Sequence, residues 1–140
     1  MVPEMVSGMA VAMRVGIVTM SRQELGILGE KLAVEELTRR GYAILERRYR
    51  TRYGEIDIVA EDQGTLVFVE VKAREDVRFG TAAEQVTARK QGKVASRAVE
   101  YLARKHVTDR PCRFDVVAID FAGTAEQTIT VYVHGFEGGG

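Results

Sequence analysis

Hydrophobic residues recur along the chain with two periods, and each period predicts a different kind of element. From Ser21 to about Arg40, leucine, alanine and valine recur at three- and four-residue spacing, which predicts an amphipathic helix. A Ser-x-x-Glu capping box at Ser21 should begin this helix, and Gly41 should end it. A second helix with an apolar face is predicted to end near Arg104.

Alternation of apolar and polar residues predicts strands in the rest of the chain. Two strands face each other across residues 61–64, whose polar composition is typical of a hairpin loop. A short strand is predicted over residues 42–46, and two more over residues 114–119 and 129–133, with Asp115 paired to an arginine. The order is helix, three strands, helix and two strands, so we expect a mixed sheet with helices packed on its faces.

Charged residues interrupt both strands of the hairpin. Asp57 lies within the first strand, and Glu70 and Lys72 lie within the second, where an unpaired buried charge would be costly. Residues two apart share a face of a strand, so Glu70 and Lys72 should project together. A loop that closes at residues 61–64 places Asp57 level with Glu70, and simple alternation predicts that Val59 shares the face of Asp57.

Two carboxylates that converge repel each other and need a cation between them. Mg²⁺ prefers oxygen ligands and binds proteins through few carboxylates and several waters, so it is the expected ion, with Mn²⁺ as a substitute. The alternative is an ordinary polar stripe, in which Glu70 and Lys72 pair on a solvated face of the sheet.

Residues 54–57 (Gly-Glu-Ile-Asp) and 69–72 (Val-Glu-Val-Lys) resemble the Asp…Glu-x-Lys core of the PD-(D/E)xK nuclease superfamily. The pattern is similar to that of archaeal Holliday-junction resolvases, and it is closer to the YraN-like family of small bacterial proteins. The resemblance covers roughly residues 26–133. It implies a restriction-endonuclease-like α/β fold, a three-layer core with a mixed central sheet in the order α-β-β-β-α-β-β.

The resemblance also implies roles for the charged residues of the hairpin. Asp57 and Glu70 would ligate Mg²⁺, and the carbonyl oxygen of Val71 would add a further ligand. Lys72 would hold the attacking water or stabilise the charge that develops on the phosphate. These roles predict metal-dependent cleavage of a phosphodiester bond in structured or branched DNA.

Two further residues enter the predicted site through the resemblance. Glu30 lies on the border of the buried face of the first helix, and in the resembled nucleases a helix glutamate joins the metal site. A solvated glutamate is the alternative at this position. Gln85 matches a position where related nucleases place a glutamine near the metal-bound water.

Basic residues surround the acidic hairpin. Arginine forks suit phosphate oxygens and tyrosines can stack on bases, so the arginines interleaved with Tyr49 and Tyr53 predict a nucleic-acid-binding segment. A polar segment that only connects two strands is the alternative. The predicted nucleic-acid-binding residues are Arg47, Arg48, Arg50, Arg52, Arg74 and Lys90.

Length and composition limit the number of domains and the classes of partner that the chain is expected to have. The 140 residues suit one domain, predicted over residues 21–136, between a poorly ordered extension at 1–20 and a flexible tail at 137–140. The 20 basic and 20 acidic residues give zero net charge, which counts against a nucleic-acid partner unless charge gathers locally. The single Cys112 excludes an intramolecular disulfide and suits the reducing cytoplasm. No apolar run is long enough to predict a membrane partner.

Three functions stay open at this point. The preferred one is a Mg²⁺-dependent endonuclease for structured DNA. The second is a non-catalytic module that binds nucleic acid or a protein partner and keeps the nuclease fold. The third is a scaffold whose acidic residues pair with its own arginines. Enzymes that cut branched DNA usually act as symmetric pairs, so a homodimer is expected by analogy.

Overall fold

The elements of the chain follow the predicted order. The computed structural model describes residues 20–78, 80–85 and 88–134, and for residues 85 and 88–92 it describes the backbone alone. The elements are α2 (Arg22–Arg39), β1 (Ala43–Thr51), β2 (Gly54–Asp62), β3 (Thr65–Ala73), the short 3-10 helix η1 (Ala83–Gln85), α3 (Ala88–Arg104), β4 (Cys112–Asp120) and β5 (Thr128–Tyr132). The predicted extension and tail lie outside the described residues, apart from Met20.

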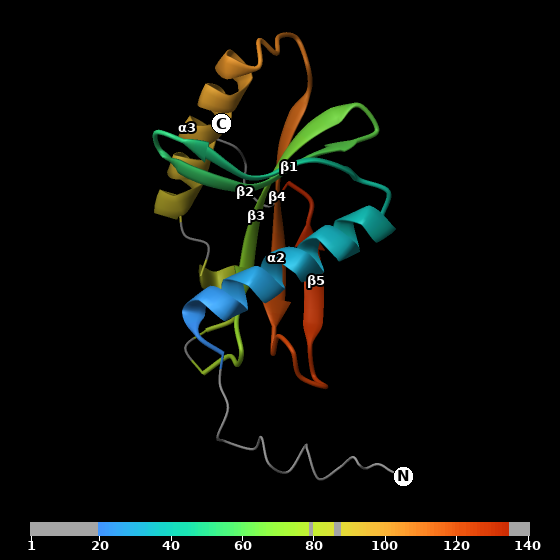
Figure 1. Cartoon of the computed structure of the whole chain (residues 1–140), viewed down its shortest axis with the longest axis vertical. Coiled ribbons are helices and arrows are strands. Elements are labelled where there is room, and N and C mark those ends of the chain that lie inside the picture. The colour runs from blue at the N-terminus through green and yellow to red at the C-terminus, as the bar shows by residue number, and fades with distance from the viewer. Residues whose placement is uncertain (1–19, 79, 86–87, 135–140) are drawn as a thin grey trace.

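The strands form one open sheet in the order β1-β2-β3-β4-β5. β3 and β4 are parallel, and the other neighbouring pairs are antiparallel. A parallel pair needs a crossover connection, and α3 lies in the connection from β3 to β4. α2 packs on one face of the sheet and α3 on the other (Figure 1). The predicted three-layer α/β fold with a mixed sheet is therefore confirmed.

The ends of α2 lie where the local sequence predicts them. The Ser21 Oγ accepts a hydrogen bond from the Glu24 N–H at 3.0 Å, and the Glu24 carboxylate accepts one from the Ser21 N–H at 2.9 Å. After the last turn, Gly41 has a φ of 95°. Glycine adopts this left-handed conformation at little cost, so it ends the helix and turns the chain towards β1.

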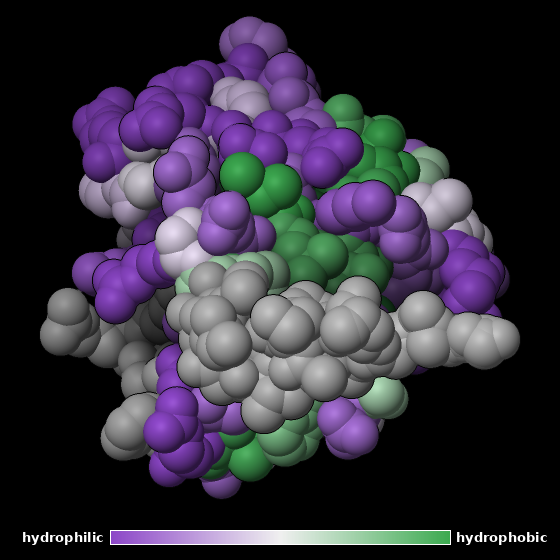
Figure 2. All heavy atoms as spheres, turned by 60° about the horizontal axis from the view of Figure 1, so that its bottom comes forward, coloured by the Kyte–Doolittle hydropathy of each residue, from purple (hydrophilic) through white to green (hydrophobic). Residues whose placement is uncertain are grey.

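Hydrophobic cores lie on both faces of the sheet. On the α2 face the buried residues include Ala33, Leu37, Ile58, Ala60, Val67, Val69, Val117 and Ile119. On the α3 face they are Ile56, Val59, Leu66, Phe68, Ala98 and Tyr101. Figure 2 shows one outer surface, where hydrophilic side chains border a narrow hydrophobic strip. Within the described residues, neither helix has the length and apolar composition needed to span a membrane.

β1 is longer than the sequence predicts. The strand expected over residues 42–46 continues to Thr51, so Arg47, Arg48 and Arg50 lie within a strand. The alternative of a segment that only connects two strands is wrong for these three arginines, because they lie within β1, where Arg47 and Arg50 pair with Ile58 and Glu55 of β2. β1 is an edge strand, and charged side chains on an edge discourage pairing with another sheet.

A buried polar cluster ties β4 to the ends of other strands. The Asp115 carboxylate is fully buried and accepts hydrogen bonds from the Tyr42 hydroxyl at 2.7 Å and from Arg113 at 2.9 Å. Arg113 also donates to Asp62 at 2.9 Å. The prediction that Asp115 pairs with an arginine is confirmed. Burial, followed by the hydrogen bond to Asp115, raises the pKa of Tyr42 to about 12.

Tyr42→Phe should lower the free energy of unfolding at neutral pH by about 1–2 kcal/mol, because Asp115 loses a buried hydrogen bond. A pKa that is raised on folding stabilises the fold below the unfolded pKa, and this stabilisation is lost as the pH rises through the folded pKa. Urea denaturation of the wild type should therefore show an additional loss, on the order of 2 kcal/mol, between pH 10 and pH 12 that the variant lacks. An equal loss in both proteins would contradict this assignment.

α2 comes close to β3 at Gly29. A Cβ atom at this position would lie 2.9 Å from the Cβ of Ala73 and 3.7 Å from the Cγ1 of Val71. One turn earlier, a Cβ at Gly26 would meet no atom within 4 Å. Gly29 therefore sets the distance between the helix and the sheet, whereas Gly26 faces open space.

Gly29→Ala should lower the free energy of unfolding by about 1–3 kcal/mol, because the added methyl group forces α2 away from β3. Gly26→Ala is the matched control in the same helix, and it should raise the free energy of unfolding by up to about 1 kcal/mol through helix propensity. Thermal denaturation measures both. Equal melting temperatures for the two variants would show that α2 does not depend on close contact at Gly29.

Candidate functional site

The hairpin of β2 and β3 determines which charged residues meet. Its loop, Gln63–Gly64, has positive φ at both residues, 49° and 87°, as the favoured two-residue hairpin turns require. From this loop the strands pair without a shift as far as Ile58 and Val69. The next pair in this register would be Asp57 opposite Glu70. The hairpin register is therefore confirmed from the loop to Ile58 and Val69, and the pairing of Asp57 with Glu70 stays a prediction.

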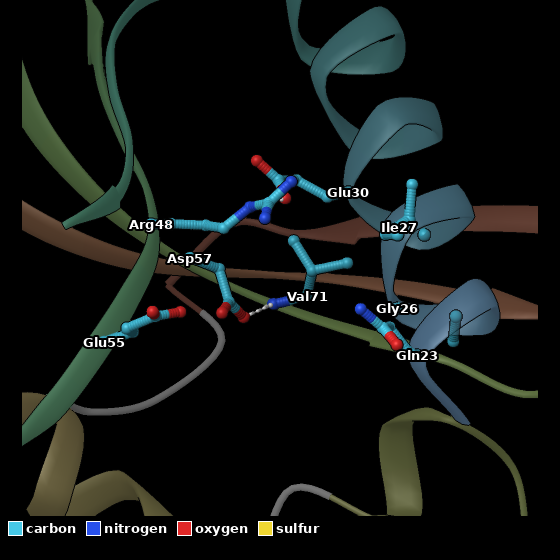
Figure 3. A pocket seen from close by; sticks show the side chains of 10 residues that line it. Gln23, Gly26, Ile27, Glu30, Arg48, Glu55, Asp57 and Val71 are labelled. Atoms are coloured by element: carbon cyan, nitrogen blue, oxygen red, sulfur yellow. Dashed lines mark hydrogen bonds and ion pairs between the residues drawn. The ribbon is translucent and has the colours of Figure 1, made fainter. Parts of the chain in front are cut away.

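The regular pairing of β2 and β3 ends one residue before that pair. At this point the side chain of Asp57, and not the backbone of β2, accepts the hydrogen bond from β3. Its carboxylate accepts a hydrogen bond from the Val71 N–H at 2.8 Å (Figure 3). The N–H and C=O of one strand residue point to the same side, so the Val71 carbonyl also faces β2. We call the gap between Asp57 and Val71 the fork. It presents a carboxylate and a carbonyl oxygen between two strands of the sheet.

Asp57 reaches the fork because the strand bends at this level. Ile56 packs on the α3 face together with Val59, whereas Ile58 packs on the α2 face. Alternation is broken at Asp57, so the prediction that Val59 shares its face is wrong. Arg48 lies opposite Asp57 on β1 and has a φ of 51°, which marks the same irregularity in the neighbouring strand.

A cavity of about 300 Å³ opens from the fork towards α2 (Figure 3). Polar side chains enter it from three elements, α2, β1 and β2, and one wall is apolar. The lining residues are Gln23, Gly26, Ile27, Gly29, Glu30, Arg48, Glu55, Asp57, Val71 and Ala73. The cavity therefore combines acidic groups with an arginine, which is the chemistry expected of a site for a cation and an anionic group together.

Glu30 lies at the side of this cavity and is held by two arginines of β1. Its Oε2 accepts a hydrogen bond from the Arg47 Nε at 2.8 Å, and its Oε1 accepts one from the Arg48 Nε at 2.6 Å. Only 7% of Glu30 is exposed, so the alternative of a solvated glutamate is wrong. The structure brings Glu30 to the same cavity as Asp57, with both of its oxygens engaged.

Glu70 and Lys72 lie on β3 itself and project to the face of the sheet opposite this cavity. β3 pairs with β4 without a shift, so alternation carries them onto the α3 face with Leu66 and Phe68. Glu70 is buried, with 4% exposure. Among the described residues, no three acidic, histidine or cysteine side chains are close enough to hold a metal ion together. That Asp57, Glu70 and Lys72 act on one metal stays a prediction.

Two further arginines of this region form ion pairs. Arg50 pairs with Glu55 at 2.8 Å, and Arg52 pairs with Glu100 at 3.2 Å. Both arginine side chains are more than 70% exposed, so they reach solvent while they hold their partners. The Arg50–Glu55 pair contributes little to stability and an incoming phosphate can displace it at little cost, whereas the Glu100 side chain is only 10% exposed and also pairs with Arg104.

Three predicted residues stand apart from the cavity. Arg74 lines a separate hollow beside Leu25 of α2, together with Glu75 and Asp76. The side chains of Gln85 and Lys90 lie outside the described residues. The roles of Arg74, Gln85 and Lys90 therefore stay predictions.

Comparison with known proteins covers most of this site. Residues 29–119 match the Uncharacterised protein family UPF0102. The chain belongs to this family. A UPF0102 protein of Symbiobacterium thermophilum is 52% identical over 101 residues, which are 72% of this chain and 85% of that protein. A UPF0102 protein of Geobacter metallireducens is 45% identical over 109 residues, 78% of this chain and 89% of that protein.

The UPF0102 match confirms the resemblance to the YraN-like family. A third relative, the UPF0102 protein of Clostridioides difficile, is 40% identical over 100 residues, 71% of this chain and 88% of that protein. The matched segment begins at Gly29, so it includes Glu30, both strands of the hairpin and the whole fork. Membership of this family does not by itself imply a reaction, so the evidence for function lies in the residues of the site.

Sequence reasoning missed the role of Arg97 on α3. Its guanidinium donates hydrogen bonds to the carbonyls of Tyr53 and Glu55, each at 3.0 Å. Gly54 has a φ of 118° and a Cβ there would lie 2.8 Å from an Arg97 nitrogen, so a larger residue would strain the backbone and displace the arginine. Arg97 thereby fixes the start of β2, three residues before Asp57. The glycine ahead of an acidic strand was the available signal.

Asp57→Ala should lower the free energy of unfolding by about 1–3 kcal/mol, because the Val71 N–H loses its acceptor where β2 and β3 separate. Asp57→Asn keeps an oxygen at the same distance and should cost clearly less, since its amide can accept the same bond. Urea denaturation of both variants checks this. If the two variants were equally destabilised, the acceptor at Asp57 would not be what holds the fork.

Proposed function

We propose that this UPF0102 protein is a metal-dependent endonuclease that hydrolyses phosphodiester bonds in structured or branched DNA. The fork carries the proposal, because the Asp57 carboxylate and the backbone of Val71 meet there at the edge of a cavity. Arg48, Glu30 and Glu55 line the same cavity and add positive and negative charge within reach of one bound phosphate.

The oxygen atoms at the fork fit a hard divalent cation. Asp57 and the Val71 carbonyl are ligands of the kind that Mg²⁺ prefers, and Mg²⁺ keeps several waters and needs few protein ligands. Mn²⁺ accepts the same oxygen ligands. Glu70 follows Val69 on β3, at the end of the paired ladder, and it is the proposed second carboxylate, which would reach the cation from the α3 face of the sheet. A cation held there supplies polarisation of a phosphate oxygen and a bound water of lowered pKa.

Charged side chains on both faces of the sheet near the fork would bind the nucleic acid and stabilise the reacting phosphate. In the proposed reaction, a water oxygen bonds to phosphorus as the water gives up a proton, the P–O ester bond breaks, and the leaving oxygen takes up a proton. The Lys72 ammonium stabilises the negative charge that grows on the phosphate. Arg47 and Arg48 hold the nucleic-acid backbone, so affinity should depend on salt and little on sequence. A cytoplasmic location and a homodimer complete the proposal.

Glu70→Gln and Lys72→Gln should each lower the cleavage rate at least about 100-fold, because each removes a charge that acts on the phosphate or its cation. The measurement is cleavage of labelled four-way junction, flap, single-stranded and duplex DNA with Mg²⁺ or Mn²⁺ at low salt. Glu61→Gln is the control on the same hairpin, since Glu61 pairs with Arg110 at the loop end. Wild-type rates in both test variants, or no cleavage of any substrate by the wild type, would overturn the proposal.

A non-catalytic nucleic-acid-binding module is the second candidate. It is favoured by the absence, within the described residues, of three acidic groups placed to hold a metal, and by the two arginines on Glu30. Calorimetry with Mg²⁺ or Mn²⁺ separates the two functions. Cation binding that is lost in Asp57→Asn supports the enzyme, whereas DNA affinity without any cation binding supports the module.

A further inference from the structure

The ion pairs of Glu30 occupy groups that the proposed function needs for other partners. Arg47 and Arg48 are about half exposed, yet both donate their Nε to the same buried carboxylate. While these bonds last, neither arginine can use that donor on a phosphate. Glu30, for its part, has no oxygen that is not already accepting from an arginine. The same pairs therefore restrict the anion site and the cation site together.

The arrangement places a carboxylate where a phosphate group would suit the arginines equally well. A carboxylate and a phosphodiester both present two anionic oxygens, and guanidinium groups bind either one with similar geometry. Glu30 accepts one bond on each oxygen, from two consecutive residues of β1. The left-handed backbone of Arg48 allows these neighbours to reach the same carboxylate, although adjacent strand residues normally point to opposite faces.

We propose that the Glu30 carboxylate substitutes for a nucleic-acid phosphate in the unbound protein, and that a phosphodiester displaces it from Arg47 and Arg48. The released Glu30 stays buried beside the cavity, where an uncompensated charge is costly. A cation near Asp57 restores that compensation. Nucleic acid and cation therefore bind with positive coupling, each strengthening the other. This inference rests on the proposed function. It adds that Arg47 and Arg48 become accessible to nucleic acid, and Glu30 to a cation, only when their ion pairs break.

The first test measures DNA binding without any divalent cation. Glu30→Gln removes the competing charge, so duplex and junction DNA should bind about fivefold more tightly by fluorescence anisotropy in EDTA. Glu36→Gln is the matched control, because Glu36 lies on the same helix and also holds two arginines, Arg39 and Arg40, at 2.6 and 2.8 Å. It makes the same change in net charge away from the cavity and should alter affinity by less than about twofold.

A second comparison excludes a general effect of charge. In the Glu30→Gln background, replacing Arg47 and Arg48 with glutamine should remove the whole gain in DNA affinity. Should Glu30→Gln fail to fold, as judged by thermal denaturation, Glu30→Asp serves instead. It keeps the charge but withdraws the carboxylate by one methylene group, and a smaller gain in affinity is expected.

The coupling is measured with Ca²⁺ as the cation probe. Wild-type protein should bind Ca²⁺ more tightly in the presence of DNA, and DNA more tightly with Ca²⁺, by the same factor. In Glu30→Gln that factor should fall towards one. Equal DNA affinities for Glu30→Gln and Glu36→Gln in EDTA would overturn the exchange, whatever the cleavage assay shows. A gain specific to Glu30→Gln, in a protein that cleaves no DNA, would uphold the exchange and reject only the proposed nuclease reaction.

Discussion

The hydrogen bond from the Val71 N–H to the Asp57 carboxylate decides how the centre of this molecule is built. In a regular hairpin the backbone hydrogen bonds would continue at this point, and the backbone N–H and C=O groups between the strands would all be paired with each other. Here a side chain closes the ladder, so the strands separate and leave oxygen atoms facing a gap. The bend of β2 at Asp57, the irregular backbone of Arg48 and the cavity towards α2 all lie around this contact.

The charges of the chain sum to zero, but their arrangement is local. Arginines of β1 meet glutamates of α2 and β2, and Arg52, just after the strand, meets a glutamate of α3, so both signs of charge lie within a few ångströms here. Glu30 belongs to this pattern because Gly29 lets α2 lie close against β3. A larger residue at Gly29 would move the helix and Glu30 with it. Close packing of Gly29 against Ala73 is thus a condition for the electrostatics of the cavity.

Local signals in the chain were sufficient for most of the elements. The capping box at Ser21 and the glycine at Gly41 act through contacts within a few residues, and each lies where it was expected. The hairpin loop is shorter than the predicted residues 61–64, because Glu61 and Asp62 pair with β3 and leave only Gln63–Gly64 in the turn. β1 is longer than the sequence predicts, because pairing with β2 stabilises strand structure in a segment whose arginines do not by themselves predict a strand. Asp57 was misplaced relative to Val59 because simple alternation assumes an unbroken strand.

The sequence by itself determined the order of elements, the hairpin register and the family, since these follow from periodicity, turn residues and motifs. Only the tertiary structure decided what the charged side chains contact. Glu30 and its arginines are 17 and 18 residues apart, and Arg97 is more than 40 residues from the carbonyls that it binds. Such contacts depend on how layers pack, and no local pattern in the chain encodes the distance between a helix and a sheet.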